Sequence, residues 1–197
     1  MNPRLSIIKR AAQTASLSLM FSVCLCSPSN AFVAGRWVGM PANGIVTGGS
    51  GGLGPLPVCR ADFNHGQHPG KLWQGQCNFE WGFEDKLQSN FQVLLDDGYH
   101  WVNPFVAPGA GIFVSGSVQV PNNAVDGGDA GDAANHVRLV VCQAYVSQDR
   151  TWHPGKFYAG KCNIAWGGAP SAGGGNVSRD RKVRTPDVYG NVLILVK

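Results

Sequence analysis

The chain has 197 residues, which is enough for one domain or for two small ones. It carries 16 Lys and Arg against 12 Asp and Glu, but three of the basic residues and none of the acidic ones lie within residues 1–31. The remainder is nearly neutral, at 13 basic against 12 acidic residues, and has no basic stripe, so the charge pattern gives no support for nucleic acid or an anionic membrane as a partner.

Residues 1–31 have the pattern of a signal peptide. Basic residues at the start precede an apolar stretch that runs to about Cys26, and Ser29 and Ala31 fit the small-x-small cleavage rule. An uncleaved anchor helix is the alternative, although Ser and Thr interrupt the stretch. We therefore expect a secreted or periplasmic protein whose mature chain begins near Phe32 and has no membrane span.

The part after residue 31 is predicted to be all-β. Its apolar runs are short and rich in β-branched and aromatic residues, as in 56–61, 91–95, 138–146 and 191–196. The chain's 27 Gly and 12 Pro separate these runs at short intervals, and no stretch keeps a helical period with caps. Short strands bounded by turn signals are typical of a β-sandwich or barrel.

The mature chain contains an internal repeat. "HPGKLWQGQCNFEWG" (68–82) returns as "HPGKFYAGKCNIAWG" (153–167), and "LPVCRA" returns as "LVVCQA" in the same relative position. The two halves are predicted as 32–106 and 107–197, with an insertion at 169–182 in the second. Each is small for an independent core, so we expect the halves to share one, with exchange of a terminal strand.

The four cysteines outside the leader are predicted to form disulfides, as an even number does in an exported chain. Four cysteines allow three connectivities. In each half one Cys lies on a strand, the HPGK segment follows, and the other Cys opens the next strand, which favours Cys59–Cys77 and Cys142–Cys162. Zinc is the alternative, but neither half has a CxxC or HxxxH spacing, so no metal is expected.

Lys71 and Lys156 each follow a Pro-Gly pair, which favours a tight turn with an exposed Lys. A solvated Lys and a ligand-binding Lys both remain open at these positions. The His at the start of each copy is interpreted as structural. Trp152 stands where the first half has Gln67, and such an additional Trp suggests stacking against a sugar ring.

The sequence gives little sign of catalysis. There is no GxSxG motif, and disulfides account for the cysteines, so a nucleophile is missing. Glu80 has no acidic counterpart in the second half, where Ala165 stands, and the other acids are scattered. The Gly-rich 48–54 lacks the Lys-Ser/Thr ending of a phosphate loop. We expect no enzyme and no cofactor.

The order of these segments, "PNNAV", "GGD", "CQA", "HPGK" and "CNIAWGG", resembles the DM9 repeat, which occurs as tandem pairs. The resemblance covers nearly the whole mature chain and is closest in the second half. It implies two tandem, interlocked, β-sandwich-like repeats related by a pseudo-twofold axis. It also implies a lectin-like protein that binds mannose-type sugar.

In such proteins an Asp of the Gly-rich loop and the Lys of the PGK segment hold sugar hydroxyls. Carried onto this chain, these residues are Asp129, with Asp132 as the alternative, and Lys156. In the first half they become Ser50 and Lys71, so the resemblance implies a weaker site there. A carboxylate accepts hydrogen bonds and an ammonium donates them, which suits a pair of hydroxyls.

Two functions follow from these features. The first is an exported protein that binds a mannose-type glycan at Asp129 and Lys156, with Trp152 nearby. A homodimer is possible, and two sites per chain or one site in a dimer would both raise the avidity for repetitive glycans. The alternative is a structural or protein-interaction module of the envelope or extracellular matrix. An ordered apolar patch in the insertion at 169–182 would favour this second function.

Overall fold

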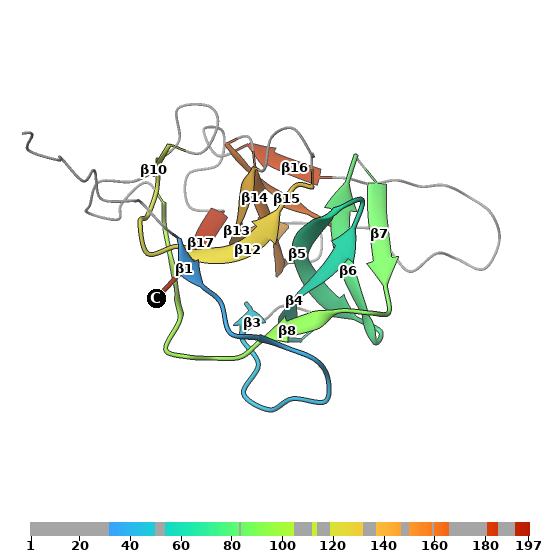
Figure 1. Ribbon diagram of the computed structural model, residues 1–197. Coiled ribbons are helices and arrows are strands. Elements are labelled where there is room, and N and C mark those ends of the chain that lie inside the picture. Colours follow the sequence, from blue (N-terminus) through green and yellow to red (C-terminus); the bar gives the residue numbers. More distant parts are fainter. Residues whose placement is uncertain are drawn as a thin grey trace, which may run out of the picture.

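The computed structural model describes most of the chain after residue 31 (Figure 1). The described residues are 32–49, 54–82, 84–104, 112–113, 119–131, 137–146, 150–158, 160–165, 181–184 and 192–197, with only the backbone described for 112–113, 119 and 181–184. Every regular element in these ranges is a β-strand, so the all-β prediction is confirmed. The predicted signal peptide, Ser50 and Asp132 lie outside the described residues.

The first large sheet is formed by residues of the first half. Its order is β2-β8-β4-β5-β6-β7, with β3 beside β4. The strands are β2 (Trp37–Val38), β3 (Thr47–Gly48), β4 (Leu56–Phe63), β5 (Gly66–Trp73), β6 (Gln76–Trp81), β7 (Glu84–Gln88) and β8 (Gln92–Leu94). In β4, Val58 packs toward the second sheet and Cys59 toward a separate core, so this strand is apolar on both faces.

The second large sheet lies beside the first in Figure 1. Its strands are β1 (Val33–Ala34), β9 (His100–Val102), β12 (Val125–Asp129), β13 (Arg138–Val146), β14 (Thr151–Tyr158), β15 (Lys161–Ile164), β16 (Arg181–Arg184) and β17 (Val192–Val196). The path β9-β17-β13-β14-β15-β16 follows from the pairings, with β12 also beside β13. A small ribbon joins β10 (Ile112–Phe113) to β11 (Gln119–Val120).

The two sheets have the same strand order and matched registers. Val93 of β8 lies opposite Cys59, and Ile194 of β17 lies opposite Cys142. Strand β9 takes the place in the second sheet that β2 takes in the first, because Trp101 pairs with β17 as Trp37 pairs with β8. Strand β9 therefore belongs to the second sheet although it precedes residue 106.

The halves share a core, as their small size predicts. A cluster between the sheets combines Val46, Val58, Leu94, Val125, Val141 and Leu195. At the beginning of the described chain, β1 pairs in parallel with β12 of the second sheet. Phe32, next to β1, packs against the second-half core. The chain therefore crosses between the sheets at its start.

Both predicted disulfides are present. Cys59 on β4 joins Cys77 on β6, and Cys142 on β13 joins Cys162 on β15. Each bond links the two strands that flank the central β5 or β14, with Cα–Cα distances of 5.8 and 5.9 Å. The disulfides are consistent with an extracellular location.

The predicted Pro-Gly turns are wrong. Pro69 lies inside β5, in a segment that pairs with β4 but not with β6, where a missing N–H costs no sheet hydrogen bond. The chain instead turns at Asn64–His65 and at Gln74–Gly75, where all four residues have positive φ. Gly70 is required for another reason, since a Cβ there would lie 2.2 Å from the carbonyl oxygen of Asn78.

Candidate functional site between the sheets

The two lysines of the repeated phrase are buried, not exposed. Lys71 on β5 and Lys156 on β14 are each only 4% exposed, which corrects the expectation of a solvated turn. Both strands are extended at these positions, so the side chains point into the contact between the sheets rather than out of a turn. Each ammonium group reaches residues of the other half of the chain.

Lys156 reaches into the first sheet. Its Nζ donates to the backbone carbonyl of Glu80 and lies 3.3 Å from the Glu80 carboxylate. The same ammonium lies 5.2 Å from the centre of the Trp81 ring. The side chains of Lys156 and Glu80 are both about 5% exposed. Burial of an ammonium is costly unless it is paired, and Glu80 supplies the opposite charge.

Lys71 makes the corresponding crossing into the second sheet. Its Nζ lies 2.8 Å from His153 Nδ1 and donates to the carbonyl of Ala165 at 2.7 Å. Ala165 stands where the first half has Glu80, so this ammonium meets a carbonyl and an imidazole. The two lysines therefore occupy matching positions in different electrostatic surroundings.

His68 lies next to the Lys156–Glu80 pair. It is fully buried, its Nε2 is 3.1 Å from the carbonyl of Phe63, and its ring stacks on Phe79. Its Nδ1 is buried and makes no hydrogen bond with the described residues. Burial, with the nearby Lys156 charge, lowers the pKa of His68 to about 4, so the imidazole is neutral near neutral pH.

The Asp129 loop packs onto the first sheet. A Cβ at Gly128 would lie 2.4 Å from the carbonyl oxygen of Gln67, and one at Gly127 would lie 2.6 Å from the Pro69 ring. Only glycine allows this contact, and it brings Asp129 to the end of β5. The Asp129 carboxylate accepts from the Gly131 N–H at 2.9 Å and, by raising the pKa of His68, opposes the effect of Lys156.

The first-half loop crosses in the opposite direction. A Cβ at Gly48 would lie 2.4 Å from the Pro154 ring, and one at Gly49 would lie 2.7 Å from Trp152. Trp152 therefore lies against the residue that precedes Ser50. Each Gly-rich loop thus packs on the opposite half, and Asp129 and Trp152 pair with or near opposite ends of β13, at Arg138 and Tyr145.

The cluster around His68 thus combines both halves of the chain. Asp129 and Lys156 come from the second half, and His68, Glu80 and Trp81 come from the first. It offers two carboxylates, one ammonium and an aromatic ring at the contact between the sheets. Lys156 and Glu80 are buried against each other, whereas Asp129 and Trp81 are partly exposed. Carboxylates accept hydrogen bonds and an ammonium donates them, which are the interactions that hydroxyl groups make.

The sequence did not indicate Glu80 as a partner of Lys156, and its interpretation of His68 was structural. The signal for Glu80 was present, since an acidic residue stands where the other copy has Ala165. Its significance depended on the crossing of Lys156 between sheets, which no local pattern reveals. In the described part of the chain, no group of three or more His, Cys, Asp or Glu could hold a metal ion.

These features define an all-β protein of two similarly ordered sheets, joined through buried lysines at their contact. The family model of the DM9 repeat matches residues 53–172, which is more than half of the chain. The chain therefore belongs to the DM9 repeat family, which is associated with carbohydrate binding. No curated protein gives a significant match to the sequence. Among the described residues, no helix is long and apolar enough to cross a membrane.

Proposed function

We propose that this protein binds a mannose-type glycan without catalysing a reaction, after export from the cell that makes it. The observation that carries the proposal is that both Asp129 and Lys156 approach the His68 region from the second half: the residue before Asp129 packs on Gln67, and Lys156 lies over Trp81, whose ring contacts His68. Asp129 and Lys156 are the two residues that the family resemblance assigns to sugar hydroxyls. Family membership and the two disulfides support the proposal.

We further propose that the two halves are interlocked repeats related by a pseudo-twofold axis. The matched strand orders and the reciprocal packing of Gly48 on Pro154 and of Gly127 on Pro69 support this arrangement. The repeats would then form two composite sites. One combines Asp129 and Lys156 with first-half residues, and the other combines the Ser50 loop with Lys71 and Trp152.

The sharpest test of sugar binding is Asp129→Asn. An Asn side chain can still accept from the Gly131 N–H, so the loop keeps its hydrogen bond and loses only the charge. A charged hydrogen bond is worth about 1.5–3 kcal/mol, so the affinity for mannose should fall about ten- to a hundredfold. Calorimetric titration of mannose measures the change. Wild-type affinity in this variant would refute the assignment of Asp129.

The reverse substitution, Ser50→Asp, is the matched gain-of-charge control. Ser50 follows Gly49 in the sequence as Asp129 follows Gly128, and Gly49 packs on Trp152, so the variant adds an acidic residue next to Gly49 in the chain. If the first-half loop lacks only the charge, the variant should bind more mannose per chain than the wild type. An unchanged stoichiometry would mean that Ser50 is not the limiting difference between the two sites.

A further inference from the structure

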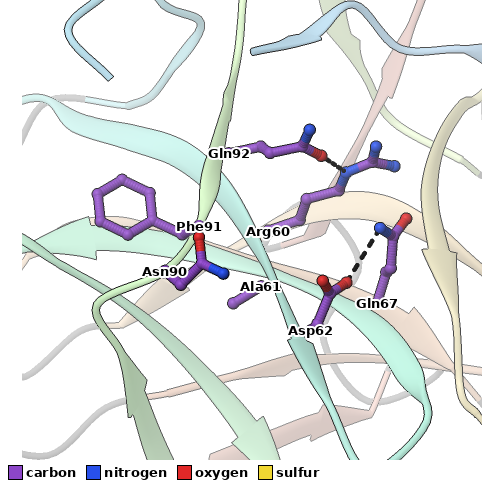
Figure 2. A pocket seen from close by; sticks show the side chains of 7 residues that line it. All are labelled: Arg60, Ala61, Asp62, Gln67, Asn90, Phe91 and Gln92. Atoms are coloured by element: carbon purple, nitrogen blue, oxygen red, sulfur yellow. Dashed lines mark hydrogen bonds between the residues drawn. The ribbon is translucent and has the colours of Figure 1, made fainter. Parts of the chain in front are cut away.

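A polar recess opens on the first sheet, apart from the Lys156–Glu80 pair. It has a volume of about 150 Å³ and is lined by Arg60, Ala61, Asp62, Gln67, Asn90, Phe91 and Gln92. Figure 2 shows Arg60 between Gln92 and the Asp62–Gln67 pair, with Phe91 and Asn90 to one side. Pockets that enclose drug-sized ligands measure about 300–1,000 Å³, so this recess suits one small polar unit.

Two contacts position the Arg60 side chain in this recess. Its Nε donates to Gln92 Oε1 at 2.9 Å, and its guanidinium lies 4.6 Å from the centre of the Trp37 ring. Burial lowers the pKa of Arg60, although the guanidinium stays charged at physiological pH. No described residue accepts a hydrogen bond from its two terminal Nη groups. The terminal donors of this partly buried guanidinium are therefore available to a ligand.

The charges around Arg60 favour a neutral ligand over an anion. Asp62 and Asp126 both lie close enough to stabilise the guanidinium charge. Asp62 also accepts from Gln67 Nε2 at 3.0 Å, which fixes the carboxylate beside the recess. Asp126 also pairs with Arg138, so two carboxylates balance two guanidinium groups and no net positive charge is left to attract a carboxylate or phosphate. Donors and acceptors placed together instead match adjacent hydroxyl groups, which both donate and accept.

The recess adjoins the Asp129 loop. Gln67 lines the recess, and its backbone and Cβ pack against Gly128, the residue before Asp129. On the other side, Trp37 donates from its indole nitrogen to the Asp126 carbonyl at 3.2 Å. Strand β12 therefore runs from the Arg60 side of the recess to Asp129. A chain of sugar units along β12 could contact both places.

The described residues of the second sheet that match the Arg60–Gln92 and Asp62–Gln67 pairs are of different types. Arg60 pairs with Gln92 across β4 and β8, and the corresponding pair across β13 and β17 is Gln143 with Leu193. Asp62 pairs with Gln67, and the corresponding pair is Tyr145 with Trp152, whose rings lie 5.6 Å apart. The polar set is therefore particular to the first sheet, beside the one loop that carries Asp129, and is not a requirement of the shared strand order.

We propose that the recess around Arg60 and Asp62 is a second glycan subsite, which binds adjacent hydroxyl groups of a neutral sugar unit linked to the one held at Asp129 and Lys156. The inference rests on the proposed function, because it takes sugar binding at Asp129 as given. It specifies the ligand further, as an oligosaccharide of at least two neutral units rather than a single sugar.

The test compares mannose with a linear mannotriose in calorimetric titrations of the full mature chain. The variants are Arg60→Gln and Asp62→Asn. Gln143 occupies the position of Arg60 in the second sheet, so a Gln is compatible with this strand geometry. Asn at position 62 can still accept from Gln67, so that variant loses the charge and keeps the hydrogen bond. Thermal unfolding identifies any variant that fails to fold.

We expect the wild type to bind mannotriose more tightly than mannose. Each variant should lower mannotriose affinity about tenfold or more and leave mannose affinity unchanged. A wild type without preference for mannotriose, or variants that keep that preference, would overturn the subsite and leave the proposed function intact. Equal losses for both sugars would also overturn it, since Arg60 would then act through the Asp129 site. Failure of the wild type to bind either sugar would overturn both proposals.

Discussion

His68 links a single buried residue to the pH dependence of the whole protein. Its pKa of about 4 lies below the unfolded value of about 6.5, so at intermediate pH the unfolded chain binds a proton that the folded protein does not. The stabilisation is fully present above pH ~6.5 and is lost as the pH falls toward about 4, by about 1.4 kcal/mol per pH unit. Denaturant titrations across this range measure the slope.

The contribution of His68 is isolated by difference, because other groups also titrate between these pH values. In His68→Asn the slope between pH ~6.5 and about 4 should be smaller than in the wild type. The charged residues that act on His68 are Lys156, Asp129 and Glu80, and all three stay in place. An identical slope in both proteins would show that His68 titrates normally.

The Lys156–Glu80 pair gives a second prediction at the residue scale. Lys156→Met leaves a buried carboxylate without its close ammonium partner, and such changes cost about 3–5 kcal/mol. The double variant Lys156→Met/Glu80→Gln removes both charges and should recover much of that loss. A double-mutant cycle in denaturant gives the coupling. Additive losses would mean that the pair does not interact as its 3.3 Å separation indicates.

At the scale of the element, each disulfide joins the outer two strands of a three-strand unit. The bonds close loops of 18 and 20 residues in sequence separation. On the chain-entropy model each should contribute about 3 kcal/mol. Paired Cys→Ala variants of either bond should therefore lose similar free energies of unfolding in denaturant. A much larger loss for one pair would point to a role beyond loop closure.

The strands themselves could be predicted, but the position of their turns could not. The β-branched runs and the spacing of Cys59 and Cys77 were sufficient for the class and the disulfide pairing. The turn predicted at Pro69–Gly70 is absent, although a Pro-Gly pair is a strong local turn signal. Its actual role is tertiary: β5 lacks a neighbour on one side at Pro69, and Gly70 admits the Asn78 carbonyl. Local propensity cannot report a contact made by another strand.

On the scale of the whole molecule, the shared interior predicts a single unfolding transition. Each half has a cluster of its own, but the cluster between the sheets and the crossing lysines mean that unfolding of one half exposes buried residues of the other. Tryptophan fluorescence and far-UV circular dichroism should give the same midpoint. Loss of one disulfide should shift this midpoint and should not separate it into two. Two resolved transitions would show that the halves fold independently.

The site could be predicted only in part, because its contacts join residues that are far apart in the sequence. The repeat pointed to Asp129, Lys156 and Lys71, and the structure describes all three near the contact between the sheets. The repeat does not indicate that the Gly-rich loops cross, so the sequence pairs Trp152 with the Asp129 loop and gives Lys156 no partner at Glu80. The Gly49–Trp152 and Lys156–Glu80 contacts join residues from different halves, which become neighbours only when the two sheets pack together.

The two ends of the described chain meet at one turn. Val33 donates to the Ala124 carbonyl at 2.9 Å, Ala124 bridges to Val196, and the C-terminus lies beside β1 in Figure 1. The residues near both ends of the described chain therefore contact the same turn, so a short link could join them and the chain could be opened at another loop. A circular permutant that joins these ends and opens at the exposed Asp97–Gly98 link would preserve every strand pair while β9 became the first strand.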